Sequence, residues 1–129
     1  MVKLKAPVKS RLTVRSTVRI PSGMLPKITE DMLNLGYNKK QQSKWIEDAL
    51  SELLDTPEYT DLIAEEFISP GTTAPINLTL SSETDDKIQH AVSQVLLKEN
   101  VEKDKSAVIR VAIIQRLLNS SGRALRLDR

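Results

Sequence analysis

Residues 11–20 read Arg11-Leu12-Thr13-Val14-Arg15-Ser16-Thr17-Val18-Arg19-Ile20, and residues 76–80 read Ile76-Asn77-Leu78-Thr79-Leu80. In both stretches apolar or small residues alternate with polar or basic ones. A period of two with β-branched residues is typical of a strand that buries one face. The sequence therefore predicts two strands. One carries Arg15, Thr17 and Arg19 on its outward face, and the other carries Asn77 and Thr79.

Two helical patterns follow the first strand, which Pro21-Ser22-Gly23 ends. Apolar residues recur at helical spacing from Leu25 to Leu35, Pro26 suits the first turn of a helix, and Gly36 suits its left-handed end. After a polar turn, a second helix presents one apolar face and ends near residues 55–57. That face consists of Trp45, Ile46, Ala49, Leu50, Leu53 and Leu54.

A short connecting helix is predicted next. Thr56 would cap this helix, and Pro57 would occupy its first position. The carboxylate of Glu58 would interact favourably with the positive N-terminal end of the helix dipole. Its apolar face would consist of Tyr59, Leu62, Ile63 and Phe67, and the stretch 69–73 reads as a linker.

The order strand, helix, helix then recurs. Ser81 or Ser82 caps a helix whose apolar face begins at Ile88, and a last helix runs from about Val108 to Gly122. The strands align with an offset of 60 residues, as Val18 with Leu78 shows, and the second helices align with an offset of 63. Matching element order and apolar phase indicate an internal repeat.

One such repeat cannot be stable alone, because a single strand has no partner for its backbone groups. We therefore predict a mainly α fold in which the two strands pair as an antiparallel ribbon over four helices, with an extra short connecting helix. The expected organisation is a basic N-terminal arm (1–12), a first repeat (13–55), a connector (56–74), a second repeat (75–120) and a basic C-terminal tail (121–129).

The charge distribution favours an anionic partner. Residues 1–21 hold six basic and no acidic residues, whereas residues 22–70 hold ten acidic and four basic ones. Nucleic acid is the commonest partner of such a basic segment, although two solvated ends would show the same charges. A two-stranded ribbon fits the major groove, where Arg suits guanine, Asn suits adenine and Thr suits several bases. The candidate base-reading residues are Arg15, Thr17, Arg19, Asn77 and Thr79.

The starts of the two second helices are candidate phosphate sites, since helix N-termini present free N–H groups and a positive dipole end. The alternative is that these serines and lysines only cap helices or line solvated turns. The candidate phosphate-binding residues are Lys39, Lys40, Ser43, Lys103, Lys105 and Ser106.

With this pattern of strands and helices, the chain resembles the ribbon-helix-helix family of DNA-binding proteins, of the Arc and MetJ type. Residues 106–112, Ser-Ala-Val-Ile-Arg-Val-Ala, look like that family's second-helix signature, at the expected distance after the second strand. Residues 43–49 follow it less closely, because Glu47 stands where the signature has Arg. The segment Pro57-Glu58-Tyr59 is similar to tandem members that assist plasmid conjugation.

The resemblance implies sequence-specific binding of double-stranded DNA through the ribbon, with the second-helix starts gripping phosphate. It implies a transcriptional repressor or a plasmid transfer or partition accessory factor, which could self-associate on DNA. A protein-interaction module, such as an antitoxin or partition adaptor, stays open as the alternative. Its partner would contact the ribbon face or residues 57–67.

Other function classes are disfavoured. The chain has no Cys, no metal-ligand cluster and no Gly-rich phosphate loop, so neither an enzyme nor a cofactor or metal site is expected. His90, the only histidine, is expected on a helix surface, and Trp45 in the core. No apolar run reaches the roughly 20 residues of a membrane helix. A cytoplasmic protein without membrane contact is the default.

Overall fold

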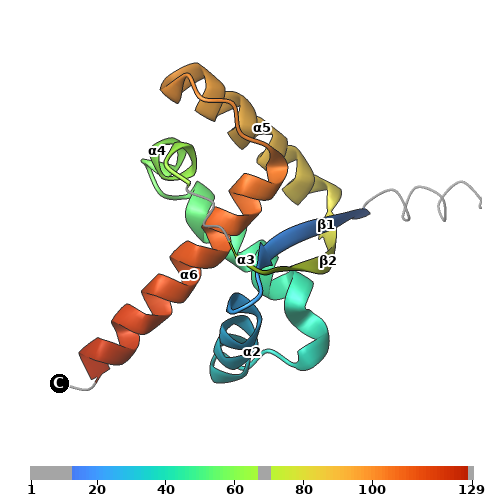
Figure 1. Cartoon of the computed structure of the whole chain (residues 1–129), viewed down its shortest axis with the longest axis vertical. Coiled ribbons are helices and arrows are strands. Elements are labelled where there is room, and N and C mark those ends of the chain that lie inside the picture. Colours follow the sequence, from blue (N-terminus) through green and yellow to red (C-terminus); the bar gives the residue numbers. More distant parts are fainter. Residues whose placement is uncertain (1–12, 67–70, 128–129) are drawn as a thin grey trace, which may run out of the picture.

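The computed structural model describes residues 13–66 and 71–127, and it is mainly helical with one two-stranded antiparallel sheet (Figure 1). Strand, helix and helix follow one another twice, with a short helix between the two sets. The elements are β1 (Thr13–Pro21), α2 (Met24–Asn34), the 3₁₀ helix η2 (Lys39–Gln41), α3 (Gln42–Leu54), α4 (Tyr59–Ala64), β2 (Thr73–Ser81), α5 (Ser82–Glu99) and α6 (Lys105–Leu127).

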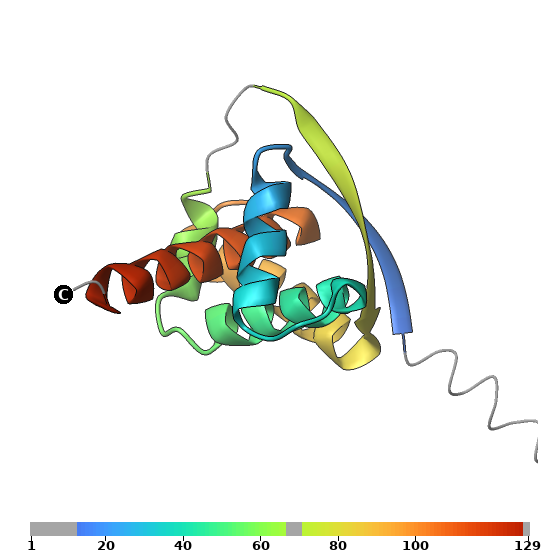
Figure 2. The same ribbon diagram turned by 90° about the horizontal axis from the view of Figure 1, so that it is seen from below.

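The two strands form a ribbon within one chain. They pair along their whole length, from Thr13 opposite Ser81 to Pro21 opposite Thr73. This confirms the predicted antiparallel pairing, although β2 begins three residues earlier than its apolar alternation suggests, because Thr73 still pairs with Pro21. Figure 2 shows the ribbon along one side of the helices. Its buried side chains are Val18, Ile20, Ile76, Leu78 and Leu80.

Both halves of the chain contribute to one hydrophobic core beneath the ribbon. The most extensive helix packing joins α3 to α6, which cross at the centre of the molecule (Figure 1). Trp45 is fully buried, as predicted, and its Nε1 donates to Asp31 Oδ2 at 2.9 Å. Burial of each large apolar side chain is worth about 1.5–3 kcal/mol, so each half contributes to the stability of the other.

A buried cation links α6 to α3. The Arg116 guanidinium lies 5.4 Å from the ring centre of Tyr37 and 5.2 Å from that of Trp45. Its Nη1 donates to the Trp45 carbonyl at 2.8 Å, and Glu52 lies 3.5 Å from its Nη2. The cation is thus held by a carbonyl, a carboxylate and two aromatic faces, which offset part of its desolvation.

Three predicted helix features are confirmed. Gly36 has a φ of +90° just after α2, which is the left-handed end that glycine favours. Pro26 lies in the first turn of α2. Ser81 caps α5, because its side chain accepts a hydrogen bond from the Thr84 N–H.

Two predicted helix boundaries are wrong. The last helix does not end at Gly122 but continues to Leu127, since one interior glycine costs only about 1 kcal/mol and the residues after it, Arg123, Ala124 and Leu125, are good helix formers. The connecting helix begins at Tyr59, not at Pro57, because the Thr56 hydroxyl donates back to the Glu52 carbonyl at 3.1 Å instead of capping forward. Phe67, predicted to lie on this helix, is outside the described residues.

Candidate nucleic-acid interface

The five candidate base-reading side chains lie on one face of the ribbon. They point away from the helices because they occupy the odd-numbered positions, whereas the even positions from 18 to 20 and from 76 to 80 are buried. The outward positions of the described strands hold no acidic residue. The exposed candidates are Arg15, Thr17, Arg19, Asn77 and Thr79.

The centre of this face is a hydrogen-bonded pair. Thr17 lies directly opposite Asn77, and its Oγ1 donates to Asn77 Oδ1 at 2.9 Å. The Asn77 amide N–H groups are not used in that bond, and its oxygen keeps a second lone pair. An asparagine held in this way can still donate and accept at the edge of an adenine.

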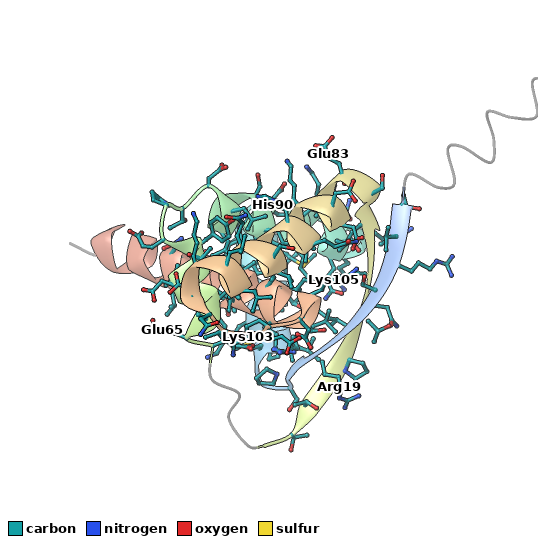
Figure 3. The ribbon with its side chains drawn as sticks, turned by 90° about the horizontal axis from the view of Figure 1, so that it is seen from above. Arg19, Glu65, Glu83, His90, Lys103 and Lys105 are labelled. Atoms are coloured by element: carbon teal, nitrogen blue, oxygen red, sulfur yellow. The ribbon has the colours of Figure 1, made fainter. Side chains whose placement is uncertain are left out.

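The two arginines of β1 differ in how they are held. Arg19 Nε donates to Thr73 Oγ1 at 2.9 Å, and its Nη2 donates to the Thr73 carbonyl at 3.2 Å. Figure 3 shows Arg19 near the end of the ribbon. The Arg15 side chain is exposed, and its guanidinium has no hydrogen-bond or ion-pair partner among the described residues. Arg15 is therefore free to reorient toward a ligand, whereas Arg19 is already oriented by its neighbour.

The first turns of α3 hold the outer edge of β2. Ser43 Oγ accepts a hydrogen bond from the Thr79 N–H at 3.0 Å, and Glu47 Oε2 accepts one from the Ser81 N–H at 2.6 Å. These bonds satisfy edge groups that would otherwise be open to another strand. Ser43, predicted to bind phosphate, thus also fixes α3 against the ribbon.

On the other side, Arg110 joins α6 to β1. Its Nη1 donates to the Arg19 carbonyl at 3.4 Å, and its Nε lies 2.5 Å from Glu66 Oε2. The pair is largely buried, with 4% of the Glu66 side chain exposed. Arg110 and Glu47 occupy matching positions under the offset of 63 residues, so opposite charges perform similar anchoring on the two sides.

The candidate phosphate groups near α6 are engaged inside the fold. Lys103 Nζ donates to the Glu66 carbonyl at 3.1 Å, and Lys105 Nζ lies 2.7 Å from Asp85 Oδ1. The hydrogen bond from Lys105 holds the pKa of Asp85 below its ordinary value, against the opposing effect of burial. Asp104 caps α6, because its carboxylate accepts from the Ala107 N–H at 2.9 Å. The Asp104 carboxylate thus already occupies the N-terminus of α6, where Ser106 lies in the first turn and where a phosphate was predicted to bind.

The start of α3 is different. Lys39 and Lys40 are exposed on η2, and neither side chain has an ion-pair partner among the described residues. No side chain caps α3 at Gln41. The 3₁₀ helix η2 runs directly into α3, and Asn38 caps it through a capping box with Gln41. The two ammonium groups of Lys39 and Lys40 therefore face solvent at the start of this helical segment.

Sequence reasoning did not anticipate the anchoring roles of Glu47, Glu66, Asp85 and Asp104. Only Asp104 has a local signal, since it immediately precedes a helix and an Asp at that position is a common cap. The residues that the other three anchor, Ser81, Arg110 and Lys105, lie 20 to 44 residues away in the chain. His90 is exposed, as predicted.

No protein-family model, curated protein or solved structure matches this chain. Within residues 13–66 and 71–127, no helix is long and apolar enough to cross a membrane. The same residues contain no cluster of His, Asp and Glu that could hold a metal ion.

Proposed function

We propose that this protein binds double-stranded DNA in a sequence-specific manner, by placing its two-stranded ribbon in the major groove. The proposed architecture is a tandem ribbon-helix-helix fold, in which one chain supplies both copies. The observation that carries the proposal is the outward face of the ribbon, where two arginines, two threonines and an asparagine are exposed together without an acidic neighbour on the strands.

The tandem architecture is supported by the position of the ribbon centre. Thr17 and Asn77 are partners across the ribbon and are also 60 residues apart, which is the offset that aligns the two strand sequences. A twofold-like operation about this pair would exchange β1 with β2. It would also exchange α3, which anchors β2, with α6, which anchors β1.

The dimensions and chemistry of the face suit a base-reading role. The major groove is about 12 Å wide and admits a two-stranded ribbon. Arginine donates in a fork to guanine, and asparagine donates and accepts at adenine. Because Arg15 and Arg19 both belong to β1 while β2 presents Asn77 and Thr79, the preferred DNA site should be asymmetric.

Phosphate contacts in this proposal are strongest beside β2. The exposed ammonium groups of Lys39 and Lys40, just before α3, form the better anion site. Lys103 and Lys105 contribute less, because a carbonyl and a carboxylate of the protein already bind them. We infer a role as a transcriptional repressor or as an accessory factor of plasmid transfer or partition, with self-association on neighbouring DNA sites.

The proposal is tested by selecting bound duplexes from a random pool with the full chain, followed by sedimentation of the complex. We expect enrichment of one asymmetric sequence and a defined number of chains on it. Weak binding without enrichment would contradict the proposal and would favour the alternative, in which the ribbon face or the region around α4 contacts a protein.

A further inference from the structure

A groove with a volume of about 700 Å³ lies between α3 and α5, beside α4. Its apolar part is formed by Leu50, Leu54 and Tyr59. Figure 3 shows Glu83 and His90, which line it, on the same side of α5. Its lining includes one ammonium group, that of Lys87, but five carboxylates, which belong to Glu47, Asp48, Asp55, Glu83 and Asp86.

Much of this negative charge is not compensated. Asp48 is held by the Tyr37 hydroxyl and by Lys44 at 3.3 Å. Glu83 and Lys87 are 3.6 Å apart, but both are largely exposed, and such pairs are weak. The carboxylates of Asp55 and Asp86 have no hydrogen-bond or ion-pair partner among the described residues. The groove therefore attracts a cationic segment.

The groove begins where the N-terminal segment joins the ribbon. Thr13, the first residue of β1, lies opposite Ser81, and Glu47 in the groove wall accepts from the Ser81 N–H. Along α3, the distance from Glu47 to Asp55 is about 12 Å. Twelve residues reach up to about 40 Å when extended, so residues 1–12 are long enough to follow the groove.

The sequence of that segment matches the groove in two respects. Cations and apolar residues alternate in Val2-Lys3-Leu4-Lys5 and again in Val8-Lys9-Ser10-Arg11-Leu12, and residues 1–12 contain no acid. An extended chain places alternate side chains on opposite sides. Four cations could then face the carboxylates while valine and leucine side chains contact Leu54 and Tyr59.

We propose that the groove between α3 and α5 is the binding site for the N-terminal segment of the same chain, residues 2–11. The tether favours this occupant, because a short linker gives an effective concentration in the millimolar range. Ion pairs with individually small energies can then keep the groove occupied. This binding is independent of whether the ribbon binds DNA.

The absence of cysteine from the sequence makes a direct test simple. The full-length Ala6→Cys chain carries a nitroxide at that position, and amide line broadening is measured by NMR. We expect the strongest broadening at Ser51, Asp55, Lys87 and His90, and its loss in about 1 M salt, where the Debye length is only about 3 Å. Asp55→Asn with Asp86→Asn should reduce the broadening by at least about threefold, since two exposed ion pairs are removed.

The matched control is Glu30→Gln with Glu102→Gln, which removes two exposed carboxylates that do not line the groove and should leave the broadening unchanged. Lys5→Gln with Lys9→Gln gives a second route that leaves every described residue intact, and it should also reduce the broadening.

Broadening that is absent from the groove, or that persists in both the Asp55/Asp86 and the Lys5/Lys9 variants, would overturn the proposal. A second sample mixes nitroxide-labelled chain without ¹⁵N and ¹⁵N-enriched chain without nitroxide. In this sample only a segment from another copy can broaden the groove signals, so it distinguishes binding within one chain from binding between chains. Groove broadening of equal strength in that mixture would assign the groove to a second copy and would also overturn it.

Discussion

Thr17 and Asn77 form the central pair of the ribbon, joined by a hydrogen bond of 2.9 Å from Thr17 Oγ1 to Asn77 Oδ1. Each is the fifth residue of a nine-residue strand. On either side of this pair the ribbon is asymmetric, since Arg15 faces Thr79 and Arg19 faces Pro75. Both arginines therefore come from β1.

This pair gives a test of whether one chain forms the whole ribbon. We predict that Thr17→Cys with Asn77→Cys forms a disulfide within a single chain, because directly opposed antiparallel residues have Cα atoms about 4.5–5.5 Å apart. A non-reducing gel and the mass of the intact protein report the result. Covalent dimers as the main product would show that strands are exchanged between chains.

The arginines of β1 should carry base specificity. We predict that Arg15→Ala and Arg19→Ala each cost about 1–3 kcal/mol on a selected duplex. The two residues are about 13 Å apart along the strand, so the guanines they prefer should be about four base pairs apart. Band-shift titration measures the loss, with Lys98→Ala near the end of α5 as the control. Unchanged affinity in both arginine variants would contradict base reading by the ribbon.

The free lysines beside α3 should contribute affinity without specificity. We predict that Lys39→Ala and Lys40→Ala each weaken binding to all duplexes alike and lower the salt slope by about one, since each removes a phosphate contact. Lys105→Ala should change the salt slope less, because Asp85 already binds its ammonium group. A loss confined to the selected sequence would argue against phosphate anchoring at this site.

The Asp85–Lys105 pair should make stability depend on pH. The pKa of Asp85 is lower in the folded protein than its ordinary value of 3.8. The ionised Asp85 therefore contributes fully to the free energy of unfolding above pH 3.8, and this contribution is lost as the pH falls through the lowered pKa of the folded state. We predict that Asp85→Asn costs about 1–2 kcal/mol at neutral pH, and that this cost shrinks as the pH falls below 3.8 and disappears below the lowered pKa of Asp85. Urea unfolding at both pH values measures this. Asp86→Asn, at the exposed neighbouring position, should have no such effect.

The buried pair of Arg110 and Glu66 should behave non-additively. Removing one partner leaves a charge with little solvent, so Glu66→Leu or Arg110→Met should each cost about 3 kcal/mol. The double variant should be more stable than either single variant, because two apolar side chains replace two charges. Denaturant unfolding of the four proteins completes the cycle. Simple additivity would mean that the pair is well solvated.

The sequence was a good guide to the outward face of the ribbon but a poorer guide to the start of α6. Alternation alone assigned Arg15 and Asn77 to one side of their strands, because side-chain direction in a strand follows from position. Lys103, just before α6, and Lys105, its first residue, were predicted to bind phosphate from the same kind of local pattern. Their partners, the Glu66 carbonyl and the Asp85 carboxylate, come from other elements, so no local pattern could identify them.

The amino-acid sequence by itself determined the strands, the order of the helices and the faces they bury, because hydrophobic period and helix-capping residues act within a few turns of chain. Tertiary structure alone decided which charges are free. Glu47 and Arg110 anchor opposite edges of the ribbon, Asp85 binds Lys105, and Lys39 stays exposed just before α3. These outcomes depend on which distant elements meet once the core of both halves has formed, and a local pattern does not contain that information.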